Sequence, residues 1–289
     1  MCPACMPATL ALILTGAASM GGVAAVFVKK RRSTAPDNRD PKVKSKEKNM
    51  EHPRIVTRDE WLAQRKELLH KEKELTRQRD ELSAERRNLP MVKVEKDYIF
   101  EGPQGPAPLR SLFGPHRQLI VYHFMFDPSW EEGCKSCSYL TDNISGGLVH
   151  LAARNTAFAA VSRAPLQKLE QFRKRMGWTF PWFSSFGNDF NYDFQVTLDE
   201  EKNSTQYNYL SSETLFQTGK IWMRKGELPG MSVFLREGDD VYHTYSAYQR
   251  GLDLFLGTYN LLDLTPLGRQ EDQEPQVMSW LRHHDRYPG

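Results

Sequence analysis

A nearly uncharged run followed by two closely spaced cysteines constrains this chain more than any other feature. Residues 118–126 read QLIVYHFMF, and Cys134 and Cys137 follow shortly afterwards. Continuous apolar sequence of this kind is typical of a central parallel strand that is covered on both faces. A CxxC pair after such a strand, at the start of a predicted helix, is typical of a redox-active dithiol. The run therefore predicts an α/β domain built on a parallel sheet.

The order of the predicted elements narrows the fold further. The sequence between the apolar run and a second one at 155–162 has room for a crossover helix, and residues 166–177 predict another helix. Residues 231–246 predict a β-hairpin with a Glu-Gly-Asp turn, and residues 251–264 an apolar closing helix. This order predicts a thioredoxin-like, three-layer α/β fold over residues 91–268.

The place of the two cysteines suggests different roles for them. Backbone N–H groups at a helix start stabilise a thiolate, so we expect Cys134 to have a lowered pKa and to be the more exposed, attacking thiol. Cys137, one turn further along, would then be the resolving thiol. Lys135 adds a positive charge between them. The pattern predicts catalysis by Cys134 and Cys137 without an organic cofactor.

Two other interpretations of the cysteine pair stay open. The pair could join His123, His150 or His243 in a metal site, although a structural zinc site usually shows a second tight ligand pair, which the globular part does not offer. The cysteines could also be a non-catalytic pair. We favour the dithiol and expect no metal.

The N-terminal region predicts a membrane anchor over residues 1–32. Residues 8–28 form a stretch without charge that is long enough to cross a bilayer. Four basic residues follow at 29–32. Positive charge after the apolar stretch predicts that the rest of the chain lies in the cytoplasm. Alternatively, translation starts at Met50 and the protein is cytoplasmic. On the anchored topology Cys2 and Cys5 would lie outside the membrane.

Residues 33–56 are rich in charge and proline, which predicts a flexible linker, and a long amphipathic helix follows over residues 57–90. Thr57 and Glu60 form a capping box at its start, and Pro90 ends it. Leucines or tryptophan recur every seven residues, whereas the positions between them are charged. This stripe would lie along the domain itself or form a homodimer through residues 57–89. The heptad residues are Trp61, Leu68, Leu75, Leu82 and Leu89.

Charge and motifs exclude several classes of function. The 289 residues carry a net charge of +3, too little to indicate a nucleic-acid partner. No phosphate-binding loop, dinucleotide fingerprint or serine-hydrolase elbow occurs in the sequence. Residues 269–289 are expected to form a polar C-terminal tail, in which the HHD sequence at 283–285 would be solvated.

Three stretches carry a resemblance to a known family: LIVYHFMFDPSWEEGCKSCSYLTDN, HLAARNTAFAAVSRAPLQKLEQFRKRMGWTFPWFSSFGNDFNYDF and ELPGMSVFLREGDDVYHTYSAYQRGLDLFLGTYNLLDLTPLGR. With them the chain resembles a thioredoxin-like bacterial and fungal family of unknown function, also catalogued as dithiol-disulfide oxidoreductases. The resemblance spans Met50 to about Tyr287. It implies kinship with the alkyl hydroperoxide reductase, peroxiredoxin and thioredoxin superfamily.

The chain departs from these relatives around the dithiol. Glu131, next to Trp130, stands where peroxiredoxins have the threonine of their peroxidatic signature, and Gly133 replaces the tryptophan that precedes the first cysteine of thioredoxin. Pro229 is the approximate counterpart of the thioredoxin proline that lies beside the dithiol. Arg163 ends the second parallel strand, at the sheet edge where α/β active sites form. We therefore expect Lys135, Trp130, Arg163 and Pro229 to support the cysteines.

These observations predict a thiol-disulfide oxidoreductase that acts on a protein or on a small thiol or disulfide. Its electron donor and the direction of electron flow stay open. A non-catalytic thioredoxin-fold interaction module is the alternative, in which the helix over residues 57–89 recruits a partner. A thiol peroxidase is a third interpretation, which the missing signature threonine disfavours.

Overall fold

The computed structural model describes residues 53–202, 204–221 and 224–288, and the largest sheet within them has eight strands. Their order across the sheet is β1-β12-β11-β4-β5-β6-β2-β3. The strands of this sheet are β1 (Val92–Lys93), β2 (Ile99–Gly102), β3 (Gly105–Pro108), β4 (Gln118–His123), β5 (Thr156–Ser162), β6 (Trp182–Ser184), β11 (Gly230–Glu237) and β12 (Asp240–Tyr248).

Strand β4 lies at the centre of this sheet, as the apolar run predicts. It pairs in parallel with β5, from Gln118 opposite Thr156 to His123 opposite Val161. On its other side it pairs antiparallel with β11, which turns back into β12. Because β4 is paired along both edges and covered on both faces, only apolar and aromatic side chains fit most of its length.

The strand order β12-β11-β4-β5 is the thioredoxin-like arrangement. Helix α2 (Lys135–Ser145) and the short α3 (Leu148–Ala152) connect the parallel strands β4 and β5. Helix α4 (Leu166–Arg175) follows β5, and α7 (Gly257–Leu262) follows the hairpin. This topology confirms the fold predicted from the order of the elements.

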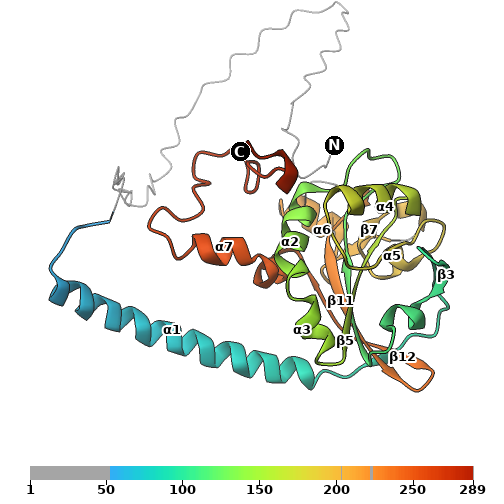
Figure 1. Ribbon diagram of the computed structural model, residues 1–289, viewed down its shortest axis with the longest axis horizontal. Coiled ribbons are helices and arrows are strands. Elements are labelled where there is room, and N and C mark those ends of the chain that lie inside the picture. Colours follow the sequence, from blue (N-terminus) through green and yellow to red (C-terminus); the bar gives the residue numbers. More distant parts are fainter. Residues whose placement is uncertain (1–52, 203, 222–223, 289) are drawn as a thin grey trace, which may run out of the picture. The chain divides into compact units, whose positions relative to one another are not determined.

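Helices cover both faces of the sheet, and Figure 1 shows α2 and α7 on one of these faces. On one face, Tyr122 and Phe124 of the β4 segment and Trp182 of β6 pack in one core with the α2 and α4 side chains. On the other face, Leu119 and Val121 pack against two short helices. These are η2 (Leu109–Phe113) and α5 (Phe190–Asp193), and η4 (Gln249–Phe255) lies between β12 and α7.

A small insertion separates α5 from β11, and the sequence did not predict it. Its elements are β7 (Thr197–Leu198), η3 (Glu200–Lys202), β8 (Gln206–Tyr207), β9 (Leu210–Ser211), α6 (Ser212–Gln217) and β10 (Gly226–Glu227). The insertion has a core of its own, in which Val196, Leu198, Tyr207 and Leu215 are fully buried. We call residues 195–228 the insertion below.

The long helix α1 (Arg58–Arg87) begins at the predicted cap. The side chain of Thr57 accepts a hydrogen bond from the N–H of Glu60 at 3.3 Å. None of the 30 residues of α1 is buried. The predicted stripe therefore remains exposed along the helix, and its members include Trp61, Leu68, Leu75 and Leu82.

The prediction of a membrane anchor is corrected by the structure. Among the residues that it describes, no helix combines the length and the apolar character needed to cross a bilayer. The predicted span at residues 8–28 lies outside the described residues, as do Cys2 and Cys5. A transmembrane segment and a membrane-anchored location therefore find no support in the described structure.

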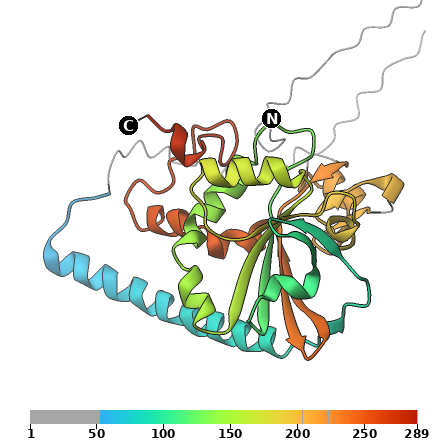
Figure 2. The same cartoon turned by 45° about the vertical axis from the view of Figure 1, so that its right-hand side comes forward.

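The end of the chain differs from the expected solvated tail. Leu281 and His283 are buried, and Leu281 belongs to the same core as the two cysteines. Both views place this C-terminal segment, drawn in dark red, beside the helices α2 and α4 (Figures 1 and 2). Residues 278–287 are therefore part of the folded domain, and the short helix η5 (His284–Arg286) closes it.

Candidate functional site

The two cysteines lie where the loop after β4 enters α2. Cys134 is the N-cap residue of α2, and Cys137 lies one turn further in. The loop is closed by the N–H of Cys134, which donates to the carbonyl of Met125 at 3.1 Å. The carbonyl of Cys134 in turn accepts the N–H of Ser138 at 2.9 Å. Cys134 is thereby fixed at the positive end of the helix dipole.

Neither cysteine reaches the protein surface. Cys134 is 0% exposed and Cys137 1%, and both are in the thiol form. This corrects the expectation that Cys134 is the more exposed thiol. The preceding Gly133 shows how tightly the loop is packed, because an added Cβ would lie 2.7 Å from the ring of Phe124 and 2.9 Å from that of Phe172. A tryptophan, as in thioredoxin, does not fit here.

Two groups of the β4 segment donate hydrogen bonds to Cys137. The N–H of Met125 lies 3.4 Å from its sulfur, and the buried hydroxyl of Tyr122 is a second partner. Burial raises the pKa of Cys137 well above the usual thiol range, and the sulfur of Cys134 raises it further. Cys137 therefore keeps its proton at neutral pH and can donate it to the sulfur of Cys134.

Both thiols line a cavity of about 780 Å³. Tyr122 and Met125 lie in the same wall as the cysteines, and Pro229, the predicted proline, lies there too. Many of the remaining lining residues are aliphatic and come from α2, from η4 and its end, and from the insertion. Six of these side chains are Leu140, Leu215, Ile221, Leu228, Leu252 and Leu256, all of them buried.

The insertion forms one wall of this cavity and is held against the sheet. The hydroxyl of Tyr207 donates to the carbonyl of Pro229 at 2.7 Å and accepts the N–H of Gln249 at 3.1 Å. Tyr207 thus joins the insertion both to the residue before β11 and to the start of η4. These contacts help to fix the position of this wall.

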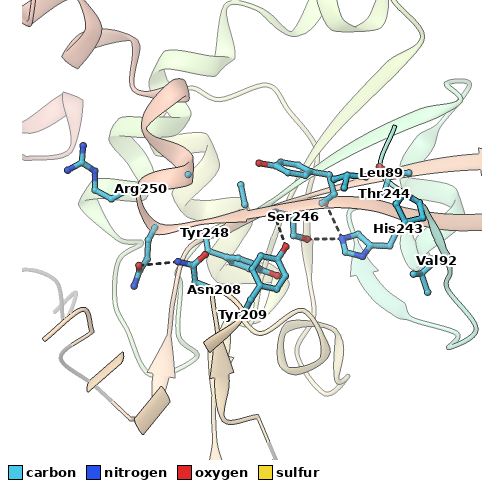
Figure 3. A pocket seen from close by; sticks show the side chains of 14 residues that line it. Leu89, Val92, Asn208, Tyr209, His243, Thr244, Ser246, Tyr248 and Arg250 are labelled. Atoms are coloured by element: carbon cyan, nitrogen blue, oxygen red, sulfur yellow. Dashed lines mark hydrogen bonds between the residues drawn. The ribbon is translucent and has the colours of Figure 1, made fainter. Parts of the chain in front are cut away.

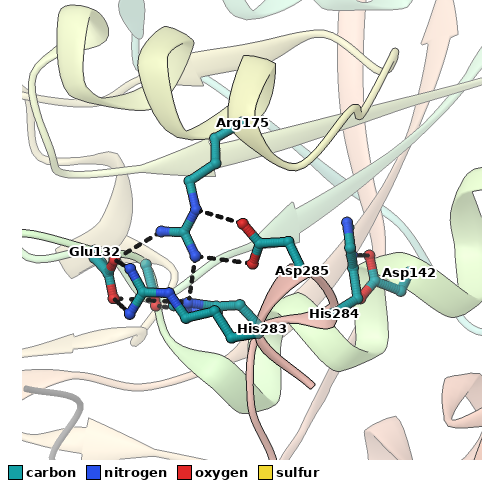
Figure 4. A network of polar contacts seen from close by, with 8 residues as sticks. Glu132, Asp142, Arg175, His283, His284 and Asp285 are labelled. Carbon is teal, nitrogen blue, oxygen red and sulfur yellow. Dashed lines mark hydrogen bonds and ion pairs between the residues drawn. The ribbon is translucent and has the colours of Figure 1, made fainter. Parts of the chain in front are cut away.

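The C-terminal segment holds the dithiol loop from the other side (Figure 4). Nε2 of His283 lies 2.9 Å from the carbonyl oxygen of Gly133. Nδ1 of the same ring lies 3.2 Å from the guanidinium of Arg175, which can only donate. His283 is therefore neutral, with its proton on Nε2, and burial lowers its pKa.

An ion-pair network surrounds this contact. Arg175 of α4 binds Glu132 at 2.7 Å and Asp285 at 2.8 Å, and Arg286 also pairs with Glu132. Residues 282–286 are thereby joined both to α4 and to the residues just before Cys134. We call His283, Arg175, Glu132, Asp285 and Arg286 the C-terminal clamp.

Of the four predicted supporting residues, only Pro229 shares the cavity with the thiols. Lys135 instead lines a hollow of about 430 Å³ together with Arg282, His283 and Arg286. Trp130 packs against the core next to the dithiol loop, and its carbonyl accepts a hydrogen bond from Lys168 at 2.9 Å. Neither residue lines the dithiol cavity.

Arg163 forms an ion pair with a residue of the insertion. Its guanidinium pairs with Glu227 at 2.8 Å, and Glu227 is 1% exposed. Burial raises the pKa of this carboxyl to about 7, against the lowering effects of Arg163 and of the hydroxyl of Thr197 at 2.9 Å. Arg163 thus compensates a buried carboxylate at the base of the insertion.

A second hollow, of about 580 Å³, runs along β12 (Figure 3). It lies between Leu89 and Val92 after α1 and Tyr209 of the insertion, whose hydroxyl donates to the carbonyl of Ser246 at 3.0 Å. This hollow contains neither cysteine, although it shares Asn208, Gln249 and Arg250 with the dithiol cavity.

The histidines weighed as metal ligands lie apart from the cysteines. His123 points to the opposite face of the sheet, where it is buried between Phe190 and Phe194 and bonds Ser232 at 2.8 Å. His243 bonds Ser246 at 2.8 Å on β12. Within the described ranges, no three His, Cys, Asp or Glu side chains are grouped as a metal ion would require.

Sequence reasoning missed Tyr122 and the C-terminal clamp. The strand alternation carried a signal for Tyr122, because side chains two apart share a face and Phe124 faces the dithiol loop. The only sequence signal for the clamp was the HHD sequence, and its polar composition predicted an exposed segment.

Comparisons with known proteins give a family match and remote structural similarities. The model of a family described as "Bacterial protein of unknown function (DUF899)" matches residues 50–287. No curated protein matches the chain. Among solved structures, it is similar to peroxiredoxin Q from Xanthomonas campestris, with 14% identity and a TM-score of 0.38 over 60% of this chain and 98% of that chain. It is also similar to peroxidoxin BcpB from Mycobacterium tuberculosis, with 12% identity and a TM-score of 0.35 over 60% and 97% of the two chains. The fold assignment stands on the strand order alone.

Proposed function

We propose that this chain, which belongs to the DUF899 family, is a thiol-disulfide oxidoreductase whose reactive groups are Cys134 and Cys137. One observation carries the proposal: the two thiols interact with each other at the start of α2 and both line a cavity. The contact of Cys137 with two hydrogen-bond donors gives the same pair a means to stabilise a thiolate.

The reaction begins at Cys134. Its thiolate attacks one sulfur of a substrate disulfide, the substrate S–S bond breaks, and the first substrate thiol leaves with a proton. Cys137 then loses its proton and attacks the sulfur of Cys134, which releases the second substrate thiol. The products are a Cys134–Cys137 disulfide and two substrate thiols, so two electrons pass from the protein to the substrate. An external dithiol can return the pair to its reduced form.

Tyr122 and the N–H of Met125 act in the second step. Burial disfavours the Cys137 thiolate, and the two donors offset part of this penalty because they bind the charged form more strongly. The same donors would stabilise Cys137 as the leaving group when the disulfide is reduced again.

A redox titration and a trapping experiment test this function. On oxidation of the wild-type protein, peptide mapping should show that Cys134 and Cys137 lose their free thiols. In a Cys137→Ser variant, the peptide with Cys134 should retain a substrate thiol as a mixed disulfide detectable by mass. Cys134→Ser is the matched control and should retain none. A dithiol that stays reduced under strong oxidant would exclude the function and leave a non-catalytic interaction module.

We also propose a role for α1 as the contact between two copies of this chain. The observation in its favour is that no residue of α1 is buried, while Trp61, Leu68, Leu75 and Leu82 are exposed at heptad spacing. Light scattering should then give the mass of a dimer, and Leu75→Lys should give a monomer. Lys73→Ser, which lies off the stripe, is the control. A wild-type monomer at all concentrations would exclude this contact.

A further inference from the structure

The burial of the thiols limits what can reach them. A disulfide of a folded protein must approach an attacking sulfur along the protein surface, but Cys134 is 0% exposed and Cys137 1%. Both cysteines line the cavity described above. Its mouth is marked by the exposed side chains of Leu210, Lys220 and Val277. A substrate must therefore be small enough to enter this space.

The size and lining of the cavity indicate the chemistry of that substrate. A volume of about 780 Å³ falls within the range of pockets that enclose small organic molecules. The wall around the sulfurs is formed mainly by buried Leu, Ile and Met side chains and by the rings of Tyr122, Tyr207 and Tyr259. Such a wall binds by removing apolar surface from water, and it offers few partners to a strongly hydrated group.

Most charged groups in the wall are already paired. Arg250 binds Asp253 at 2.7 Å, and Arg269 binds Asp263 at 2.6 Å. Glu271 accepts hydrogen bonds from Tyr259, from Trp280 at 2.7 Å and from the N–H of Met278 at 3.0 Å. A polyanionic or zwitterionic disulfide would have to compete with these partners.

We propose that the substrate is a small disulfide with an apolar carbon skeleton, bound in this cavity, and not a disulfide of a folded protein. This inference rests on the dithiol function proposed above. In the reaction, Cys134 attacks one sulfur of an R–S–S–R substrate and the substrate S–S bond breaks. Cys137 then displaces the second half, so one molecule of disulfide yields two molecules of RSH and one protein disulfide.

Three oxidants distinguish this inference from the function itself. Dibutyl disulfide and bis(2-hydroxyethyl) disulfide are both small and acyclic, but only the first is apolar throughout. Insulin supplies disulfides of a folded protein. Stopped-flow oxidation of the fully reduced chain, with one turnover per molecule, needs no added reductant. We expect dibutyl disulfide to react about 10- to 100-fold faster than the hydroxylated compound, from the extra methylene groups buried, and insulin to react slowest.

A pair of exposed leucines provides the matched variants. Leu210 lines the cavity mouth, whereas Leu254 is exposed and does not line the cavity. Leu210→Asp should lower the rate of oxidation by dibutyl disulfide several-fold and change the rate with the hydroxylated compound little. Leu254→Asp should leave both rates unchanged. Equal rates for the two small disulfides, or faster reaction of insulin, would overturn the substrate class while the dithiol function stands. Failure of all three oxidants to form the Cys134–Cys137 disulfide would overturn both.

Discussion

The imidazole of His283 donates a hydrogen bond to the carbonyl of Gly133 at 2.9 Å, across 150 residues of sequence. Gly133 immediately precedes the N-cap cysteine of α2, so the last residues of the chain help to fix the position of Cys134. The same imidazole accepts from Arg175, which is itself bound to Asp285 and Glu132. The dithiol loop is therefore held by groups from α4 and from the C-terminus together.

Loss of this contact should loosen the dithiol loop. In His283→Ala the buried carbonyl of Gly133 loses its partner, so we expect the free energy of unfolding to fall by about 1–3 kcal/mol. Alkylation of Cys134 by iodoacetamide should become several-fold faster, because the loop opens more often. The control is His284→Ala, whose side chain is exposed and bonds Asp142 at 2.8 Å. Equal stability and labelling in the two variants would contradict the role of the clamp.

Removal of the Tyr122 hydroxyl should slow the second step of the proposed reaction. Tyr122→Phe keeps the ring in the core and removes one of the two donors to Cys137. A hydrogen bond to a charged group contributes about 1.5–3 kcal/mol, so resolution of the mixed disulfide should slow by roughly 10-fold or more. Quenched samples analysed by mass should then show the mixed disulfide accumulating. The rate of its formation should change little, and a slower first step instead would assign Tyr122 to Cys134.

Acid should destabilise the protein through His123. Burial lowers the pKa of this imidazole to about 3, and the neighbouring His243 adds to the effect. An unfolded histidine titrates near 6.5, so the unfolded state binds more protons as the pH falls from about 6.5 towards 3. The free energy of unfolding should therefore be highest above about pH 6.5 and should fall below it, by up to about 1.4 kcal/mol per pH unit from this residue.

The variant His123→Gln isolates this contribution. The amide can still bond Ser232 but does not titrate, so urea unfolding between about pH 7 and pH 5 should show a shallower loss of stability than in the wild type. The other histidines are common to both proteins and cancel in the comparison. Parallel pH profiles would show that another group causes the acid sensitivity.

The pair between Arg163 and Glu227 should matter for stability more than for the thiols. In Arg163→Met the buried carboxylate loses its compensating charge, which costs about 3–5 kcal/mol in comparable pairs. The double variant Arg163→Met/Glu227→Gln removes both charges and should recover part of this loss. Urea midpoints measure both effects. A change in dithiol redox potential without a change in stability would instead place Arg163 at the reactive site.

The central part of the fold could be predicted because local sequence determines it. The run around Val121 is apolar on both faces, which is typical of a strand that is covered on both sides. The CxxC pair marks the start of the helix that follows. The burial of Cys134 could not be predicted in this way. It involves the C-terminal segment, whose His283 contacts Gly133 across 150 residues, and the insertion, which lines the same cavity as the cysteines.

The surroundings of polar residues were predicted wrongly where their partners lie far away in the sequence. His283 and Asp285 resemble a solvated end when only their neighbours are considered, and Arg175 of α4 supplies the partner that sequence spacing does not reveal. Arg163 likewise ends a strand at the edge where active sites form, yet its partner Glu227 lies in the insertion. In both cases the partner is a residue that no local pattern connects to it.

The wall contributed by residues 195–228 has its own packed core and is attached through Tyr207, whereas the thiols belong to α2 and the sheet. On the proposed function, the insertion that lines part of the cavity and the two thiols therefore lie on separate stretches of polypeptide. Exchange of side chains such as Leu210 or Leu215 can alter which molecules are admitted without touching the sulfur pair. On the proposed function, an insertion of this kind lets a thioredoxin-like scaffold vary in specificity while the dithiol stays unchanged.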